Sequence, residues 1–262
     1  MTATFAFGFL VAAAILEAVY LFRRDGALDP VSPVFLSAAL VLLAVEIARR
    51  SLAIRFFALT SLYESLLFLS WLLAALALAY RYQRRFSYFP KLGFGMSLLA
   101  LAFLALASSP LAPKGVRPPV PALQSGWLVL HVSFAFVGES LFALSFAASV
   151  AYLFSRDGKR REELDRIAYT AVAAGYPIFT LGALIFGAVW AEQAWGSWWS
   201  WDPKETWAAV TWLVYTAYLH LRLVAKKGGR SVALLSVLGF ALTLFTFFGV
   251  NFLLKGGLHS YK

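Results

Sequence analysis

Apolar side chains form long runs along this chain, and short clusters of charged residues separate the runs. Most runs approach the roughly 20 residues with which a helix crosses a hydrocarbon core about 30 Å thick. The pattern therefore predicts an all-α fold, a polytopic bundle of eight membrane-spanning helices that forms one integral membrane domain, 1–262. The predicted spans are residues 4–22, 34–48, 62–80, 92–107, 127–154, 166–190, 207–224 and 231–254.

The second predicted span is short, with about 15 residues between Pro33 and the pair Arg49 and Arg50. Such a segment either crosses the membrane with little tilt or is partly re-entrant, and the sequence leaves both readings open. The first span is followed, not preceded, by Arg23 and Arg24, so it is predicted to be a retained span and not a cleaved signal peptide.

Basic residues are distributed unevenly between alternate loops. Of the 23 Lys and Arg residues, 15 fall on one side of the predicted membrane and 8 on the other. The richer side is predicted to be cytoplasmic, which puts both termini outside, and the cluster Arg49 to Arg55 is the one misfit. Two loops on the outer side have distinctive compositions: a proline-rich connector, about 108–126, and a tryptophan-rich loop, about 190–212.

The overall composition agrees with a membrane protein and excludes a soluble globular enzyme, because 61% of residues are hydrophobic and only 14% are charged. The chain has no cysteine, which excludes disulfides, thiol chemistry of its own and an iron–sulfur cluster held by its own thiolates. The net charge of +10 reports orientation in the bilayer, and we expect no nucleic-acid partner.

Tryptophan is concentrated in one place. Clustered indoles make a rigid apolar surface with a few N–H donors, which suits a planar hydrophobic ligand. We favour this interpretation over a simple aromatic belt at the membrane interface, because a belt distributes tryptophans over many span ends. Within the cluster, Asp202, Pro203 and Glu205 have the spacing of a helix start, with Asp202 as the N-cap. Seven of the nine tryptophans belong to the cluster: Trp190, Trp195, Trp198, Trp199, Trp201, Trp207 and Trp212.

The segment from Trp195 to Trp207 resembles the WWD signature of proteins that handle haem in cytochrome c maturation. Its continuation Asp-Pro-Lys-Glu-Thr-Trp is similar to the CcsA (ResC) branch of system II cytochrome c synthesis. The resemblance covers most of residues 56–262. It extends to Tyr63-Glu-Ser-Leu-Leu-Phe-Leu-Ser-Trp71, Trp127-Leu-Val-Leu-His131, Tyr218-Leu-His220 and the run from Gly249 to Tyr261.

The chain has three histidines, at two predicted depths. His131 lies ~6 Å below the outer surface and His259 follows the last span, so both are near the tryptophan loop, whereas His220 lies about 20 Å down, nearer the cytoplasmic face. His131 and His259 can therefore supply the two axial imidazoles of one haem iron. His220 needs a second ligand, which is either the thioether of Met96 or a histidine of another polypeptide.

Two acidic residues are weaker candidates. Glu139 shares a helix face with His131 and lies deeper in the membrane, where it could line a polar path or pair with an inward arginine. Glu64 lies at the outer start of the third span, and it would contact haem propionates only through water or an arginine, because like charges repel. A helix-start role is the alternative for Glu64.

The resemblance implies a haem-handling subunit of a cytochrome c synthase in a bacterial plasma (inner) membrane, or in a thylakoid membrane if the chain is from a plastid. Haem b, as transported ligand and substrate, would enter near His220 and be held outside by His131 and His259. The lining would come from Trp195, Trp198, Trp199, Trp201 and Asp202. The expected partners are a CcsB (ResB) type membrane protein, with which the chain would act as a haem lyase, and apocytochrome c with its Cys-x-x-Cys-His segment. The alternatives are a CcmC-like haem exporter or chaperone, and an anchor subunit that binds no haem.

Overall fold

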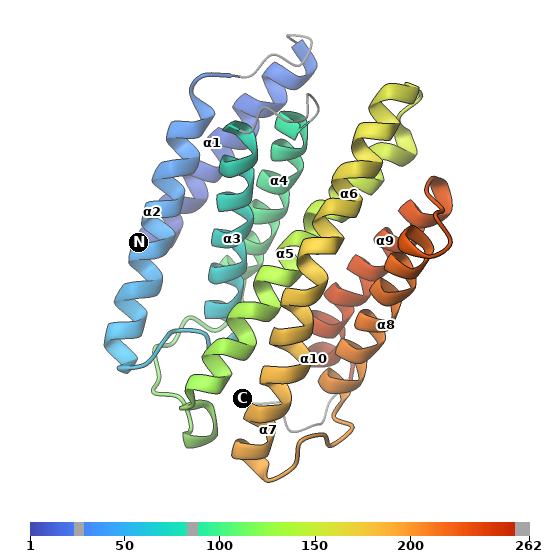
Figure 1. The fold of residues 1–262 in the computed structure, drawn as a ribbon. Helices are drawn as coiled ribbons and strands as arrows, with labels where there is room; N and C mark the ends of the chain where they lie inside the picture. The colour runs from blue at the N-terminus through green and yellow to red at the C-terminus, as the bar shows by residue number, and fades with distance from the viewer. Residues whose placement is uncertain (24–28, 83–88, 255–262) are drawn as a thin grey trace. The chain divides into compact units, whose positions relative to one another are not determined.

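The protein is described by a computed structural model that covers residues 1–23, 29–82 and 89–254, and all regular secondary structure in these ranges is helical (Figure 1). The chain divides into two compact units, Met1–Gln124 and Ser125–Lys262. Unit 1 and unit 2 are described separately below. The predicted all-α class is confirmed.

Unit 1 is a ring of four helices. The helices are α1 (Thr2–Arg23), α2 (Ser32–Ile54), α3 (Leu62–Tyr82) and α4 (Phe89–Ser108). Each helix packs against the next along the chain, and α1 also packs against α4, which closes the ring. After α4 the chain has no regular secondary structure in residues 113–120 and then forms a single 3-10 turn, Pro121–Leu123.

Helix α2 is longer than its predicted span. The carboxylate of Asp29 accepts hydrogen bonds from the backbone N–H groups of Val31 and Ser32 at its start. The helix then continues for 23 residues, past Arg49 and Arg50, and ends where Arg55 adopts a left-handed conformation with φ 53°. The predicted end at residue 48 is therefore wrong. The arginine pair ends an apolar run but does not end the helix, because arginine is itself a good helix former.

Unit 2 is a second ring of four long helical segments. They are α5 (Gly126–Phe154), the continuous rod of α6 (Gly158–Phe179), η2 (Thr180–Phe186) and α7 (Gly187–Trp195), then α8 (Pro203–Leu223), and lastly α9 (Arg230–Leu244) with η3 (Phe245–Gly249) and α10 (Val250–Phe252). Helix α5 packs against α6 and α9, and α8 packs against the same two helices. Both η2 and η3 are π-helical.

The two ends of unit 2 carry different chemistry. At one end, the Ser125 hydroxyl at the start of α5 donates to the side-chain carbonyl of Gln193 in α7 at 3.1 Å, and the tryptophan loop follows α7 directly. We call this the tryptophan end. At the opposite end, Arg222 of α8 pairs with Asp165 of α6 at 2.6 Å.

Within the ranges that the structure describes, six helical segments are long and apolar enough to cross a membrane, which makes the chain a polytopic membrane protein. They are α1, α2, α3, α5, the α6–α7 rod and α9 with η3. In α4 the apolar stretch Leu92–Ser108 is shorter, and α8 is rich in tryptophan, tyrosine and threonine, which lowers its hydropathy. A crossing by all eight segments, and the outside position of both termini, stay predictions.

Candidate haem-handling site

His131 lies in the second turn of α5, with its ring held on two sides. Its Nδ1 atom is 2.8 Å from the carbonyl oxygen of Gly182 in the π-helix η2. A carbonyl oxygen can only accept a hydrogen bond, so Nδ1 carries the proton of the neutral ring and the lone pair is on Nε2. A histidine that binds a metal through one nitrogen commonly donates from the other nitrogen to such a carbonyl.

Two indoles link the His131 ring to the start of the tryptophan loop. The ring stacks on Trp190 with centroids 5.9 Å apart and an interplanar angle of 11°. Trp190 in turn meets Trp195 edge to face at 4.8 Å. Trp190 is almost fully buried, at 2% exposure, and one face of the imidazole packs against it. The structure thus brings His131 and the beginning of the loop together.

The loop itself presents two indoles outward. Trp198 is 58% exposed and Trp201 is 76% exposed, whereas Trp199 is half-buried and meets Trp201 edge to face at 5.8 Å. Trp201 has a left-handed backbone with φ 58°, which is uncommon for a bulky residue and indicates local strain. Exposed aromatic faces of this size are suited to binding a flat apolar molecule.

Asp202 is the N-cap of α8, as the sequence predicts. Its carboxylate accepts a hydrogen bond from the backbone N–H of Lys204 at 2.9 Å, and the Glu205 carboxylate accepts from the N–H of Asp202 at 3.3 Å, which completes a capping box. Glu205 also accepts from the N–H of Ser200 at 2.8 Å. Asp202 is only 5% exposed, so its main contacts stabilise the junction between the loop and α8. A haem contact by Asp202 stays a prediction.

His220 lies in the last turn of α8, toward the opposite end of unit 2 from the tryptophan loop. It is 13 residues beyond Trp207, about 20 Å along a helix, so it does not join His131. Its side chain is exposed. It shares one face of α8 with Leu213, Ala217 and Val224, which are also exposed.

The second ligands that the sequence suggests, His259 and Met96, are not tested by the structure. His259 lies outside the described residues, so its pairing with His131 stays a prediction. Met96 is completely buried within the protein. Met96 belongs to unit 1 and His220 to unit 2, so a thioether ligand from Met96 also stays a prediction.

Glu139 lies two helical turns beyond His131 on α5, at a half-buried position. Among the residues that the structure describes, no arginine or lysine forms an ion pair with it. The inward arginine that the sequence suggested is therefore not found in this part of the chain. A role in a polar path stays a prediction.

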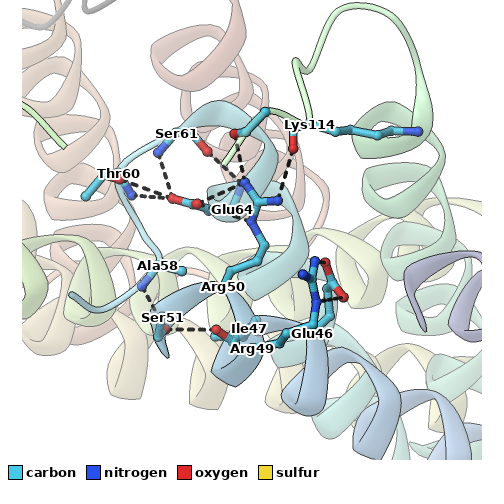
Figure 2. Close-up of polar contacts among 11 residues, drawn as sticks. Glu46, Ile47, Arg49, Arg50, Ser51, Ala58, Thr60, Ser61, Glu64 and Lys114 are labelled. Carbon is cyan, nitrogen blue, oxygen red and sulfur yellow. Dashed lines mark hydrogen bonds and ion pairs between the residues drawn. The ribbon is translucent and has the colours of Figure 1, made fainter. Parts of the chain in front are cut away.

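Glu64 does contact an arginine, and Figure 2 shows why this contact leaves little for a ligand. Arg50 donates to the Oε1 atom of Glu64 from two nitrogens, at 3.1 and 3.2 Å. The same guanidinium donates to the carbonyls of Lys114 and Gly115 at 3.1 and 3.2 Å. Four of its five N–H groups are thus engaged, and its side chain is only 2% exposed.

The remaining oxygen of Glu64 is occupied locally. Its Oε2 atom accepts from the backbone N–H groups of Thr60 and Ser61 at 3.0 and 3.2 Å, and the Ser61 hydroxyl accepts from the N–H of Glu64 at 3.3 Å (Figure 2). This is a capping box at the start of α3. The helix-start reading of Glu64 is confirmed, and the pair joins α2, α3 and the proline-rich connector within unit 1.

Sequence reasoning missed the glycines that accommodate His131. A Cβ atom on Gly182 would lie 2.3 Å from the backbone nitrogen of Ala135, and one on Gly187 would lie 2.9 Å from Nδ1 of His131. Both glycines lie in an apolar run whose sequence is typical of any membrane-spanning helix. Their spacing of five residues matches one π-helical step, but nothing else marks a π-helix in the sequence.

The fold and the site together define a polytopic helical membrane protein with a histidine and a tryptophan loop at one end of its second unit. A sequence model of the family described as Cytochrome C assembly protein matches residues 59–259. This match covers well over half of the chain, so the chain belongs to the cytochrome c assembly protein family.

Individual relatives agree with this membership. The chain is 41% identical over 174 residues to the cytochrome c biogenesis protein CcsA of Chlamydomonas reinhardtii, an alignment that covers 63% of this chain and 48% of that protein. It is 37% identical over 207 residues to CcsA of Prochlorococcus marinus (strain AS9601), covering 66% and 65%. For CcsA of Guillardia theta the identity is 38% over 194 residues, covering 63% and 64%. The chain thus spans about half to two thirds of the length of these relatives.

Proposed function

We propose that this chain is the haem-handling subunit of a cytochrome c synthase, in which haem enters near His220 and is held at the tryptophan end by His131 and His259. The observation that carries the proposal is the placement of His131. Its Nδ1 donates to Gly182, its face stacks on Trp190, and Trp190 contacts the first indole of the loop. An imidazole with a fixed tautomer, linked through Trp190 and Trp195 to the start of the tryptophan loop, has the chemistry that an axial ligand of haem requires.

The exposed position of His220 supports a second ligand from another chain. A histidine on an apolar face within a membrane protein is costly unless it has a partner. The neighbours of His220 on that face, Leu213, Ala217 and Val224, are exposed and apolar, as expected where a partner helix packs. We propose that a CcsB-type membrane protein supplies the second ligand of an entry site at the opposite end of unit 2.

Attachment requires only positioning by this chain. Each thiol of the Cys-x-x-Cys-His segment adds across one haem vinyl group, with sulfur bonding to one carbon and hydrogen to the other, so no atom is lost and no net oxidant is needed. The histidine of the apocytochrome then replaces one of the two outer ligands. The absence of cysteine in this chain is consistent with this chemistry, because both sulfurs come from the substrate.

The direct test is to coexpress the chain with and without a CcsB-type partner and a c-type apocytochrome, and to assay covalent haem on the cytochrome. We expect attachment with the partner present and its loss in the double variant His131→Ala/His259→Ala. If attachment survives in that variant, the outer ligand assignment is wrong. The entry site is tested by His220→Ala in the same double-variant background, where haem should no longer copurify with the protein.

The same experiment separates the alternatives. A haem exporter or chaperone without attachment activity would bind haem and give a Soret band, yet it would leave the cytochrome without covalent haem in the presence of the partner. An anchor subunit would show no Soret band at all.

The variants Trp198→Ala and Trp201→Ala test whether the tryptophan loop binds haem. Both indoles are exposed, so their loss removes apolar contact area with little effect on the packed interior.

A further inference from the structure

The helical rod beside His131 changes its hydrogen-bonding pattern at the level of the imidazole. The π-helix η2 begins three residues after Pro177, a residue that lacks a backbone N–H and interrupts the α-helical pattern of α6. In η2 the carbonyl of Gly182 accepts from the backbone N–H of Gly187, five residues on. It also lies 2.8 Å from Nδ1 of His131, so both of its lone pairs are engaged.

Two glycines make this geometry possible, in different ways. At Gly182 the rod approaches α5 so closely that a Cβ atom would lie 2.3 Å from the nitrogen of Ala135 and 2.6 Å from the carbonyl carbon of Phe134. At Gly187 the space that a side chain would fill is taken by the imidazole itself, with Nδ1 at 2.9 Å and Cε1 at 3.0 Å from the Cβ position. Gly182 therefore sets the distance between the rod and α5, and Gly187 leaves room for the ring.

We infer that Gly182 and Gly187 are positioning residues for His131, which use the π-helical carbonyl to fix the imidazole tautomer and orientation for haem ligation. The inference rests on the proposed function. A hydrogen bond from Nδ1–H to a carbonyl raises the basicity of Nε2, which strengthens its bond to iron and favours the ferric state. Trp190, stacked on the ring, limits its rotation. A shift of the ring would weaken both effects, although Gly187 itself touches no ligand.

The test uses the full-length chain and its Gly187→Ala variant, with Gly158→Ala as the matched control. Gly158 lies in the same helical rod, and a Cβ atom there meets nothing within 4 Å. We expect Gly187→Ala to weaken haem binding in a spectroscopic titration by about 10- to 100-fold, the range typical of lost outer-shell contacts. The midpoint potential of bound haem should also become more positive. Equal affinity and potential in the Gly187→Ala and Gly158→Ala proteins would overturn the inference.

A double-variant comparison keeps the inference testable if Gly187→Ala destabilises the protein. The close contact of the added methyl group is with the His131 ring, so His131→Ala should relieve it. We expect the loss of melting temperature caused by Gly187→Ala to disappear in the His131→Ala background. An equal loss in both backgrounds would place the role of Gly187 elsewhere and contradict the inference.

The His131→Ala protein also separates the inference from the proposed function. If its haem affinity and spectrum equal those of the unchanged chain, His131 is not a haem ligand and the proposed outer site fails. If His131→Ala changes both while Gly187→Ala changes neither, the outer site stands and the positioning role of the glycines fails.

Discussion

Unit 1 and unit 2 are both rings of four helical segments, but they satisfy their buried polar side chains in different ways. In unit 1 the buried arginines meet carboxylates: Arg50 pairs with Glu64 at 3.1 Å, and Arg81 lies 3.3 Å from Asp29 and 3.8 Å from Glu17. Buried charges need such partners, because leaving the water is costly for each one alone. Unit 1 is thus fixed by ion pairs at both ends of α3.

In unit 2 several of the interior side-chain contacts join neutral groups. His131 donates to a carbonyl, Ser145 and Ser236 share a hydrogen bond of 2.8 Å, and Tyr176 and Thr216 share one of 2.7 Å. The ion pair of Arg222 and Asp165 is partly exposed at one end. Breaking a contact between neutral groups leaves no buried charge unpaired, so such a change costs less in unit 2 than the loss of a buried ion pair costs in unit 1.

The largest expected effect concerns the ion pair of unit 1. Replacing Arg50 with Met leaves the buried Glu64 carboxylate without its cation and should lower the free energy of unfolding by about 3–5 kcal/mol. The double variant Arg50→Met/Glu64→Gln should lose much less than the sum of the two single variants, because it removes both charges. Thermal or denaturant melts of the four proteins in detergent measure this coupling, and additive losses would mean that the pair does not stabilise unit 1.

A somewhat smaller effect is expected from close packing in unit 2. A Cβ atom on Gly138 would lie 2.7 Å from Cβ and 2.9 Å from Cα of Phe179, so Gly138→Ala should separate α5 from α6 and cost about 1–3 kcal/mol. Gly8 of unit 1 has nothing within 4 Å of its Cβ position, so Gly8→Ala should instead stabilise its helix by roughly 0.5–1 kcal/mol. Melting temperatures that move in the same direction would contradict the assigned contacts.

The cap of α8 should contribute about 1 kcal/mol. Asp202→Ala removes the acceptor for the N–H of Lys204 and should destabilise unit 2 by that amount, whereas Asp202→Asn keeps an acceptor and should preserve stability. Comparing haem binding by the two variants then separates the cap from a charge-dependent haem contact. Weakened haem binding by a stable Asp202→Asn protein would show that the carboxylate charge itself takes part.

The smallest effect is expected for the partly exposed ion pair at the end of unit 2 opposite the tryptophan end. Arg222 and Asp165 are 16% and 24% exposed, so Asp165→Asn should cost only about 0.2–1 kcal/mol, less than either buried pair of unit 1. The melting temperature of the unchanged chain should also approach that of the variant as salt is raised, because solvent ions screen the pair. A loss that does not depend on salt would indicate that this pair behaves as a buried one.

Local signals made two helix starts, those of α3 and α8, predictable, whereas α6 begins at Gly158, eight residues before its predicted span. The cap at Asp202 and the capping box at Glu64 both join residues within a few positions of one another, so their spacing in the sequence is sufficient. The end of α2 is not predictable from hydropathy, because the partners of Arg50 are distant in the sequence: Glu64, 14 residues further along, and carbonyls 64 and 65 residues away. Hydropathy alone predicts that a span ends at an arginine, even where that arginine is buried and paired.

The sequence by itself determined the membrane class, the approximate positions of most apolar helices and the resemblance in the tryptophan loop, because apolar runs, caps and motifs are local properties of the chain. Only the tertiary structure decided what His131 touches, since Gly182 is 51 residues away and its carbonyl reaches the ring through a π-helix. Whether a polar side chain in a membrane is paired, capped or available depends on atoms that packing brings together, and periodicity carries no information about them.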